Sequence, residues 1–150
     1  GYNNRAGVYA KFSRYPEALA DFEKAARLNP GNFRIYLNRG VMLKINRQYD
    51  AALGDFNNAI AVNPGYPRIY VEMGNVYALQ EKFDLAVEQY SKALQLAPDD
   101  PSIFLRRGIT YYRLHRSREA LEDLENVLRI DPGNHRASEY KQLMNRGPAK

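Results

Sequence analysis

RLNPGNFRIYLNRG (residues 27–40) is followed 34 positions later by AVNPGYPRIYVEMG (residues 61–74). Both stretches contain Asn-Pro-Gly, then Arg-Ile-Tyr, then a closing Gly, all at the same offsets. A shift of 34 also aligns one proline in every copy without an insertion or deletion: Pro30, Pro64, Pro98 and Pro132. Self-similarity at a fixed period of this length is typical of an array of structural repeats, each of which is one supersecondary unit.

Each repeat carries the apolar pattern of two helices. In the second repeat, Tyr36, Gly40 and Leu43 are spaced i, i+4 and i+7, and residues 52–60 follow with the same period. A proline follows the second helix of each repeat and ends that helix, because proline lacks an N–H. We therefore predict an all-α protein of antiparallel helix pairs in a single domain. The predicted repeats are 1–32, clipped at its N-terminus, then 33–66, 67–100 and 101–134, followed by a capping helix at 135–146.

Two further columns predict how the helices of a pair pack. A Gly inside a helix costs about 1 kcal/mol relative to Ala, so its recurrence at one place indicates a close approach to a facing Ala: Gly40, Gly74 and Gly108. In three repeats an Arg of the first helix precedes an Asp of the second by the same interval, which places the two face to face across the pair. The sequence thus predicts three bidentate ion pairs: Arg5–Asp21, Arg39–Asp55 and Arg107–Asp123.

These columns resemble the tetratricopeptide repeat family. Its recurring aromatic, Gly or Ala, Ala, aromatic, Ala and Pro have counterparts at Tyr36, Gly40, Ala52, Phe56, Ala59 and Pro64. Four residues depart from the family pattern without changing the fold prediction. Leu43 replaces an aromatic residue, Leu124 replaces Phe, Val127 replaces Ala, and Ser117 stands where the other repeats have Tyr or Phe. The resemblance implies a right-handed α-solenoid, in which the first helix of each pair lines a concave groove that holds peptides or partner helices.

On this geometry the groove is both basic and apolar. Once the three paired Arg are set aside, cations alternate with aliphatic residues along the first helices, a mixture that points to coverage by a partner. We therefore predict a protein or peptide partner, an acidic segment with apolar anchors. The predicted contacts are the cations Lys11, Arg34, Lys44, Arg68, Arg106 and Arg113; the aliphatic residues Leu37, Val41, Val71, Leu105 and Ile109; and the asparagines Asn4, Asn38 and Asn75.

Two ligand-binding patterns of the family are incomplete in this chain. The carboxylate clamp, with which some members hold a chaperone's C-terminal tail, requires Lys, Asn, Asn, Lys and Arg, whereas the corresponding places hold Asn3, Gly7, Asn38, Arg68 and Glu72. A chaperone tail is therefore not an expected partner. A ladder of groove asparagines, which binds a ligand's backbone, extends no further than Asn4 and Asn38.

Composition narrows the function further. The net charge is +5, but no dense run of Lys and Arg marks nucleic-acid binding. The chain has no Cys, its two His stand apart, and it contains no phosphate-binding Gly-rich loop, so we expect neither cofactor, metal nor catalysis. No apolar stretch is long enough to span a membrane, which favours a soluble, cytoplasmic protein. Self-association and an RNA-binding helical repeat are the alternatives.

Overall fold

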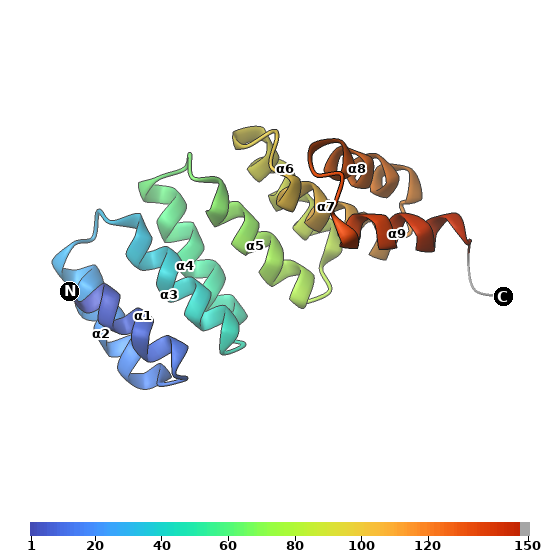
Figure 1. Ribbon diagram of the computed structural model, residues 1–150. Coiled ribbons are helices and arrows are strands. Elements are labelled where there is room, and N and C mark those ends of the chain that lie inside the picture. The colour runs from blue at the N-terminus through green and yellow to red at the C-terminus, as the bar shows by residue number, and fades with distance from the viewer. Residues whose placement is uncertain (148–150) are drawn as a thin grey trace. The chain divides into compact units, whose positions relative to one another are not determined.

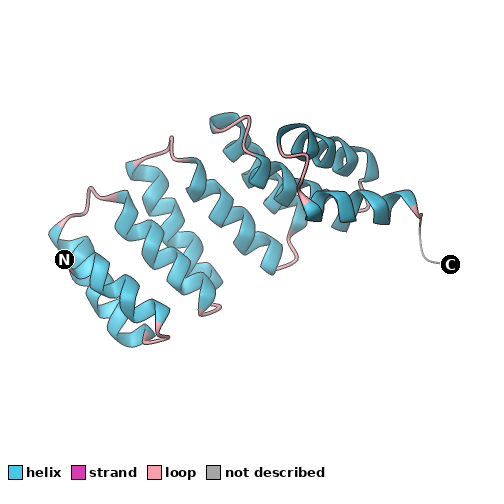
Figure 2. Ribbon diagram, viewed as in Figure 1, coloured by secondary structure: helices cyan, strands magenta, loops and turns pink. Residues whose placement is uncertain are grey.

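The computed structural model describes residues 1–147, which form nine α-helices and no strand (Figures 1 and 2). The first helices of the pairs are α1 (Tyr2–Lys11), α3 (Phe33–Ile45), α5 (Pro67–Leu79) and α7 (Pro101–Arg113). The second helices are α2 (Tyr15–Leu28), α4 (Tyr49–Val62), α6 (Phe83–Leu96) and α8 (Ser117–Ile130), and α9 spans His135–Asn145. The second helices begin 34 residues apart throughout, so the predicted all-α, paired-helix fold is confirmed.

The helices gather into two compact units. Unit 1 is Gly1–Val76, in which α1 packs on α2, α3 packs on α4, and α3 also contacts α1 and α2. Unit 2 begins at Tyr77; in it α6 contacts α7, α7 packs on α8, and α8 contacts α9. None of the helices among residues 1–147 is both long enough and apolar enough to cross a membrane.

The turn within each helix pair has a left-handed residue at the same place. Ser13, Arg47, Glu81 and His115 all have φ of 59°. At the end of α3, the Arg47 amide donates to the Lys44 carbonyl and the Gln48 amide to the Leu43 carbonyl, which is the Schellman pattern of helix termination. Glycine usually fills this position, because a side chain there costs about 1 kcal/mol or more.

Tight packing is confirmed at two of the repeated glycines, Gly40 and Gly108. A Cβ on Gly40 would meet the ring of Phe56, and a Cβ on Gly108 would lie 3.1 Å from Asp123 Cβ. At Gly108 the predicted facing Ala is also close, because the Ala120 carbonyl oxygen would be 3.5 Å from that Cβ. Large side chains thus fill the space that these glycines leave.

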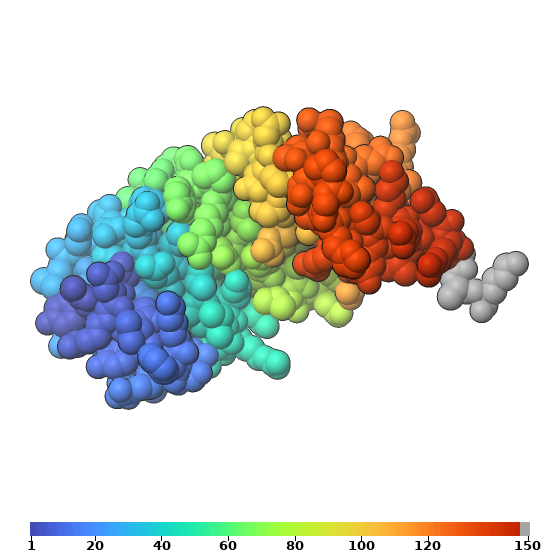
Figure 3. Space-filling model, viewed as in Figure 1, coloured from blue at the N-terminus to red at the C-terminus, as the bar shows by residue number. Residues whose placement is uncertain are grey.

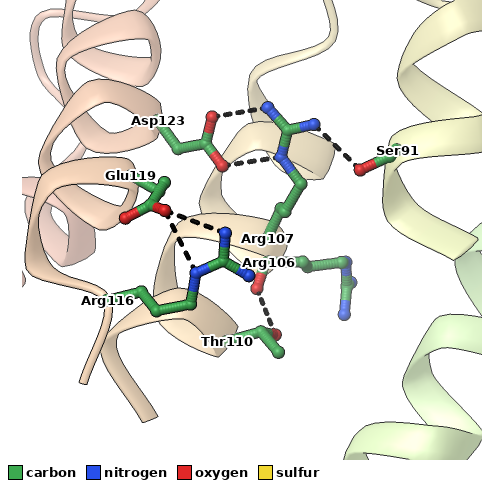
Figure 4. Close-up of polar contacts among 7 residues, drawn as sticks. All are labelled: Ser91, Arg106, Arg107, Thr110, Arg116, Glu119 and Asp123. Carbon is green, nitrogen blue, oxygen red and sulfur yellow. Dashed lines mark hydrogen bonds and ion pairs between the residues drawn. The ribbon is translucent and has the colours of Figure 1, made fainter. Parts of the chain in front are cut away.

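The three predicted Arg–Asp pairs are confirmed, and each is bidentate, with the Arg donating through Nε and Nη2 to the two carboxylate oxygens. The distances are 2.6 and 2.8 Å for Arg5–Asp21, 2.7 and 2.7 Å for Arg39–Asp55, and 2.8 and 2.8 Å for Arg107–Asp123. Figure 4 shows that Arg107 also donates through Nη1 to Ser91 Oγ of α6, at 3.0 Å. These bonds raise the pKa of the three guanidinium groups. Arg5 lowers the pKa of the Asp21 carboxyl, whereas burial raises the pKa of Asp123 and outweighs Arg107.

The α9 helix covers the last repeat, as the sequence predicts. Its Ala137 joins Leu105, Leu124 and Val127 in one buried cluster. The partly buried residues packed against that cluster are Phe104, Ile109, Leu128, Tyr140 and Met144. In the space-filling view the red atoms of α9 lie against the orange atoms of α8 (Figure 3). Leu143 of α9 lies outside this cluster and is exposed.

Candidate functional site

A pocket of about 430 Å³ opens between α1 and α3 in unit 1. It brings together four of the predicted contacts, Asn4 and Lys11 from α1 and Asn38 and Val41 from α3. The other lining residues are Asn3, Gly7, Val8, Ala10, Phe22, Met42 and Ile45. The pocket therefore has a largely apolar wall with a few amides and one cation.

The missing side chain of Gly7 on α1 leaves room for this pocket. Gly7 stands in the column that holds Val41 in the next repeat, and Asn3 stands in the column that holds Leu37. A Cβ on Gly7 would meet no atom within 4 Å, so the space beside it is open. From the sequence, Gly7 could be assigned only as a missing clamp residue, because spacing does not show that its absent side chain leaves a cavity.

The pocket combines apolar side chains of different exposure with amides and one ammonium group. Phe22 and Met42 are buried, while Val8 and Ile45 are exposed. Asn38 Nδ2 donates to Asn3 Oδ1 at 3.4 Å, which links α3 to α1. Lys11 is the one charged residue of the lining, and it is exposed. Such a pocket can hold an apolar side chain while the amides bind a backbone and the ammonium group attracts a carboxylate.

Two of the predicted cations, Lys44 and Arg68, form ion pairs with the carboxylate of Glu72. Lys44 Nζ lies 2.6 Å from Glu72 Oε2, and Arg68 Nε lies 3.6 Å from Glu72 Oε1. Asn75 Nδ2 adds a contact of 3.5 Å to Glu72 Oε2. Sequence spacing did not predict the contact between Lys44 and Glu72, because the repeat pattern does not pair residues 28 positions apart.

Arg34 has a different environment at the start of α3. Its guanidinium lies 5.3 Å from the ring centre of Phe33 and 5.5 Å from that of Tyr66. The two rings are 4.9 Å apart. Because the cation stacks on aromatic faces while remaining exposed, it is held near the turn between α4 and α5 rather than in the pocket.

Two of the five aliphatic residues predicted to line the groove are buried, which corrects their assignment as ligand contacts. Leu37 is 2% exposed and Leu105 is 9% exposed, so both belong to the core. Ile109 is partly buried against the cluster beneath α9, and Val71 is half-buried. The predicted helices that carry these residues are present, but Leu105 and Ile109 pack with residues of α8 and α9.

The remaining predicted contacts lie in unit 2. Arg106 is exposed on α7. Arg113 lies 5.1 Å from the ring centre of Phe83 and its Nη2 is 3.9 Å from Glu81 Oε1. The sequence predicts that these residues and those of unit 1 line one groove, and this stays a prediction. Among residues 1–147, no group of three or more His, Asp or Glu is placed to hold a metal ion.

Family models match three parts of the chain. Residues 1–32 and 22–54 match models described as tetratricopeptide repeat, and residues 74–114 match one described as TPR repeat. A comparison with curated proteins found no significant match.

Several solved structures share this fold. The crystal structure of MamA has a TM-score of 0.84 at 18% identity, and the match covers 94% of this chain and 83% of that one. YrrB, described as a TPR protein with an unusual peptide-binding site, has a TM-score of 0.80 at 26% identity over 94% of this chain and 73% of its own. The first TPR of Spaghetti (RPAP3), bound to an HSP90 peptide, has a TM-score of 0.72 at 22% identity over 76% of this chain and 90% of its own.

Proposed function

Because the chain is a tetratricopeptide repeat protein, and thus a protein-interaction scaffold, we propose that it is non-catalytic and binds a short segment of a partner protein between α1 and α3. The observation that carries the proposal is the pocket itself. Four residues selected from sequence alone line one cavity, together with apolar side chains that a ligand can cover. The peptide-binding descriptions of YrrB and of RPAP3 support the same class of function.

The proposed segment has an apolar anchor and an acidic residue beside it. The anchor enters the space next to Gly7, where no atom lies within 4 Å of a Cβ, and it contacts Val8, Val41 and Ile45. The amides of Asn4 and Asn38 bind the segment's backbone. Lys11 attracts the acidic residue, which speeds the encounter more than it prolongs the complex.

A substitution that fills the pocket tests this proposal. Random dodecapeptides displayed on phage are selected on the folded protein, and the affinity of the selected peptides is measured by fluorescence anisotropy. Gly7→Leu places a side chain in the cavity and is expected to weaken binding about tenfold or more, because the anchor loses its site. Gly54→Leu is the matched control, since a Cβ on Gly54 also meets no atom within 4 Å but Gly54 lies on α4, away from the pocket lining.

The outcome separates the pocket from other surfaces. Equal affinity of the wild type and Gly7→Leu would contradict the proposal, and so would an equal loss in both leucine variants. Lys11→Glu adds a kinetic test, because it is expected to slow association with an acidic peptide and to weaken its dependence on salt.

A further inference from the structure

We propose that Glu72 is a specificity-determining residue that excludes acidic side chains from the part of the groove next to the pocket. Its carboxylate occupies the place between Lys44 and Arg68 that a ligand's carboxylate would otherwise take. The accepted segment then carries its acidic residue at the Lys11 end and a neutral residue beside Glu72. This inference rests on the proposed function, and it names the charge pattern of the partner.

The contacts of Glu72 resemble those of a bound acidic ligand. Oε2 lies 2.6 Å from Lys44 Nζ and 3.5 Å from Asn75 Nδ2, while Oε1 lies 3.6 Å from Arg68 Nε. Both oxygens therefore have donors within reach, from α3 and from α5 itself. Glu72 is only 8% exposed, so its charge is poorly screened by solvent and the contacts hold it in place.

The position of Glu72 in the repeat places it beside the pocket residues. Glu72 follows Asn38 by 34 residues, as Asn38 follows Asn4, so the three occupy the same place on α5, α3 and α1. Asn4 and Asn38 line the pocket. We call Lys44, Arg68 and Glu72 the Glu72 cluster. A segment that crosses α1 and α3 and continues over α5 would next meet this cluster.

The charges of the Glu72 cluster determine which ligand side chains can bind beside it. Lys44, Arg68 and Glu72 together carry a charge of +1 instead of the +2 of the two cations alone. A second carboxylate would be repelled by Glu72 and would have to displace it from Lys44, whose side chain is itself only 17% exposed. Separating a poorly hydrated ion pair in this way opposes binding.

An aspartate scan tests the inference. In a peptide selected on the wild-type protein, each neutral residue is replaced in turn by Asp, and each affinity is measured by fluorescence anisotropy. In the wild type, Asp is expected to weaken binding at one or two adjacent positions on one side of the anchor. Glu72→Gln is expected to reverse that loss about fivefold or more at those positions only, because Lys44 and Arg68 are then free to pair with the peptide.

Two further variants complete the experiment. Glu23→Gln removes the same charge from an exposed site on α2, outside the pocket lining and the Glu72 cluster, and is expected to leave the scan unchanged. The double variant Lys44→Met with Glu72→Gln leaves no unpaired Lys44 charge in the cluster. It is expected to abolish the loss at the same positions, and it serves as the test if Glu72→Gln alone unfolds, as judged by circular dichroism.

The possible results separate this inference from the proposed function. A scan that is the same in the wild type, Glu72→Gln and the double variant would overturn the role of Glu72. If Gly7→Leu still weakens binding in that case, the pocket proposal stands and only the charge rule fails. Peptide binding that ignores Gly7→Leu would overturn the proposed function itself.

Discussion

The ring of Phe56 lies where a side chain on Gly40 would have to be. A Cβ at Gly40 would be 2.5 Å from Phe56 Cε1 and 2.8 Å from Cδ1, well inside van der Waals contact. Phe56 is completely buried, so its ring is enclosed by the core and cannot turn out into solvent. Gly40 is therefore required, because Phe56 of α4 fills the space that a side chain there would need.

Replacement of Gly40 and Gly7 by Ala is expected to change stability in opposite directions. Gly40→Ala should lower the free energy of unfolding by about 1–3 kcal/mol, because it overpacks the core against Phe56. Gly7→Ala, with open space around its Cβ, should raise it by about 0.5–1 kcal/mol through helix propensity. Urea unfolding followed by circular dichroism measures both, and a stabilised Gly40→Ala variant would contradict the packing argument.

The Arg39–Asp55 pair is expected to be coupled energetically. Its side chains are 18% and 6% exposed, and two bonds of 2.7 Å join them. A double-mutant cycle with Arg39→Ala and Asp55→Ala should give about 1 kcal/mol or more. The same cycle on Arg5 and Asp21 should give less, because the Arg5 side chain is 55% exposed. Additive effects at Arg39 and Asp55 would refute a structural role for this pair.

The left-handed turn residues are expected to be sites where Gly stabilises the fold. Arg47→Gly relieves a side chain at φ of 59° and should raise the free energy of unfolding by about 0.5–1 kcal/mol. The adjacent Asn46, with φ of −81°, is the control, and Asn46→Gly should be neutral or destabilising. Thermal unfolding of the two variants decides the matter, and a less stable Arg47→Gly would show that the Arg side chain makes a larger contribution than its backbone costs.

The capping role of α9 is expected to depend on one of its faces. Tyr140 packs against the buried cluster and makes an edge-on contact with Tyr112, with ring centres 5.4 Å apart. Tyr140→Ala should cost about 2 kcal/mol or more, whereas Leu143→Ala, at an exposed position, should change stability by less than about 0.5 kcal/mol. Equal effects in denaturant unfolding would mean that α9 does not cover the last repeat through this face.

The repeat period made the helices and the three Arg–Asp pairs predictable. Arg39 and Asp55 recur as a pair with the same separation in other repeats, so sequence spacing carries the geometry of their contact. Glu72 and Lys44 have no such repetition, because their contact depends on two particular side chains meeting between neighbouring first helices. Periodicity therefore could not predict that Lys44 is already paired.

The direction of side chains at the edge of a helix face was harder to predict. Leu37 and Leu105 share one column with Asn3, and a helical period alone assigns that column equally well to a groove or to a core. Only the packed structure shows that the two leucines are buried. The left-handed turns were also hidden, because Ser13, Arg47, Glu81 and His115 share no residue type that indicates a positive φ.

On the proposed function, the open space beside Gly7 separates partner choice from the packing of the core. At Gly40 a neighbouring ring meets any added side chain, whereas at Gly7 no atom lies within 4 Å of an added Cβ. A single codon change at Gly7 would then close or reshape the proposed pocket without overpacking the core. Duplicated copies of this gene would acquire new binding partners through such a position before any residue of the shared architecture had to change.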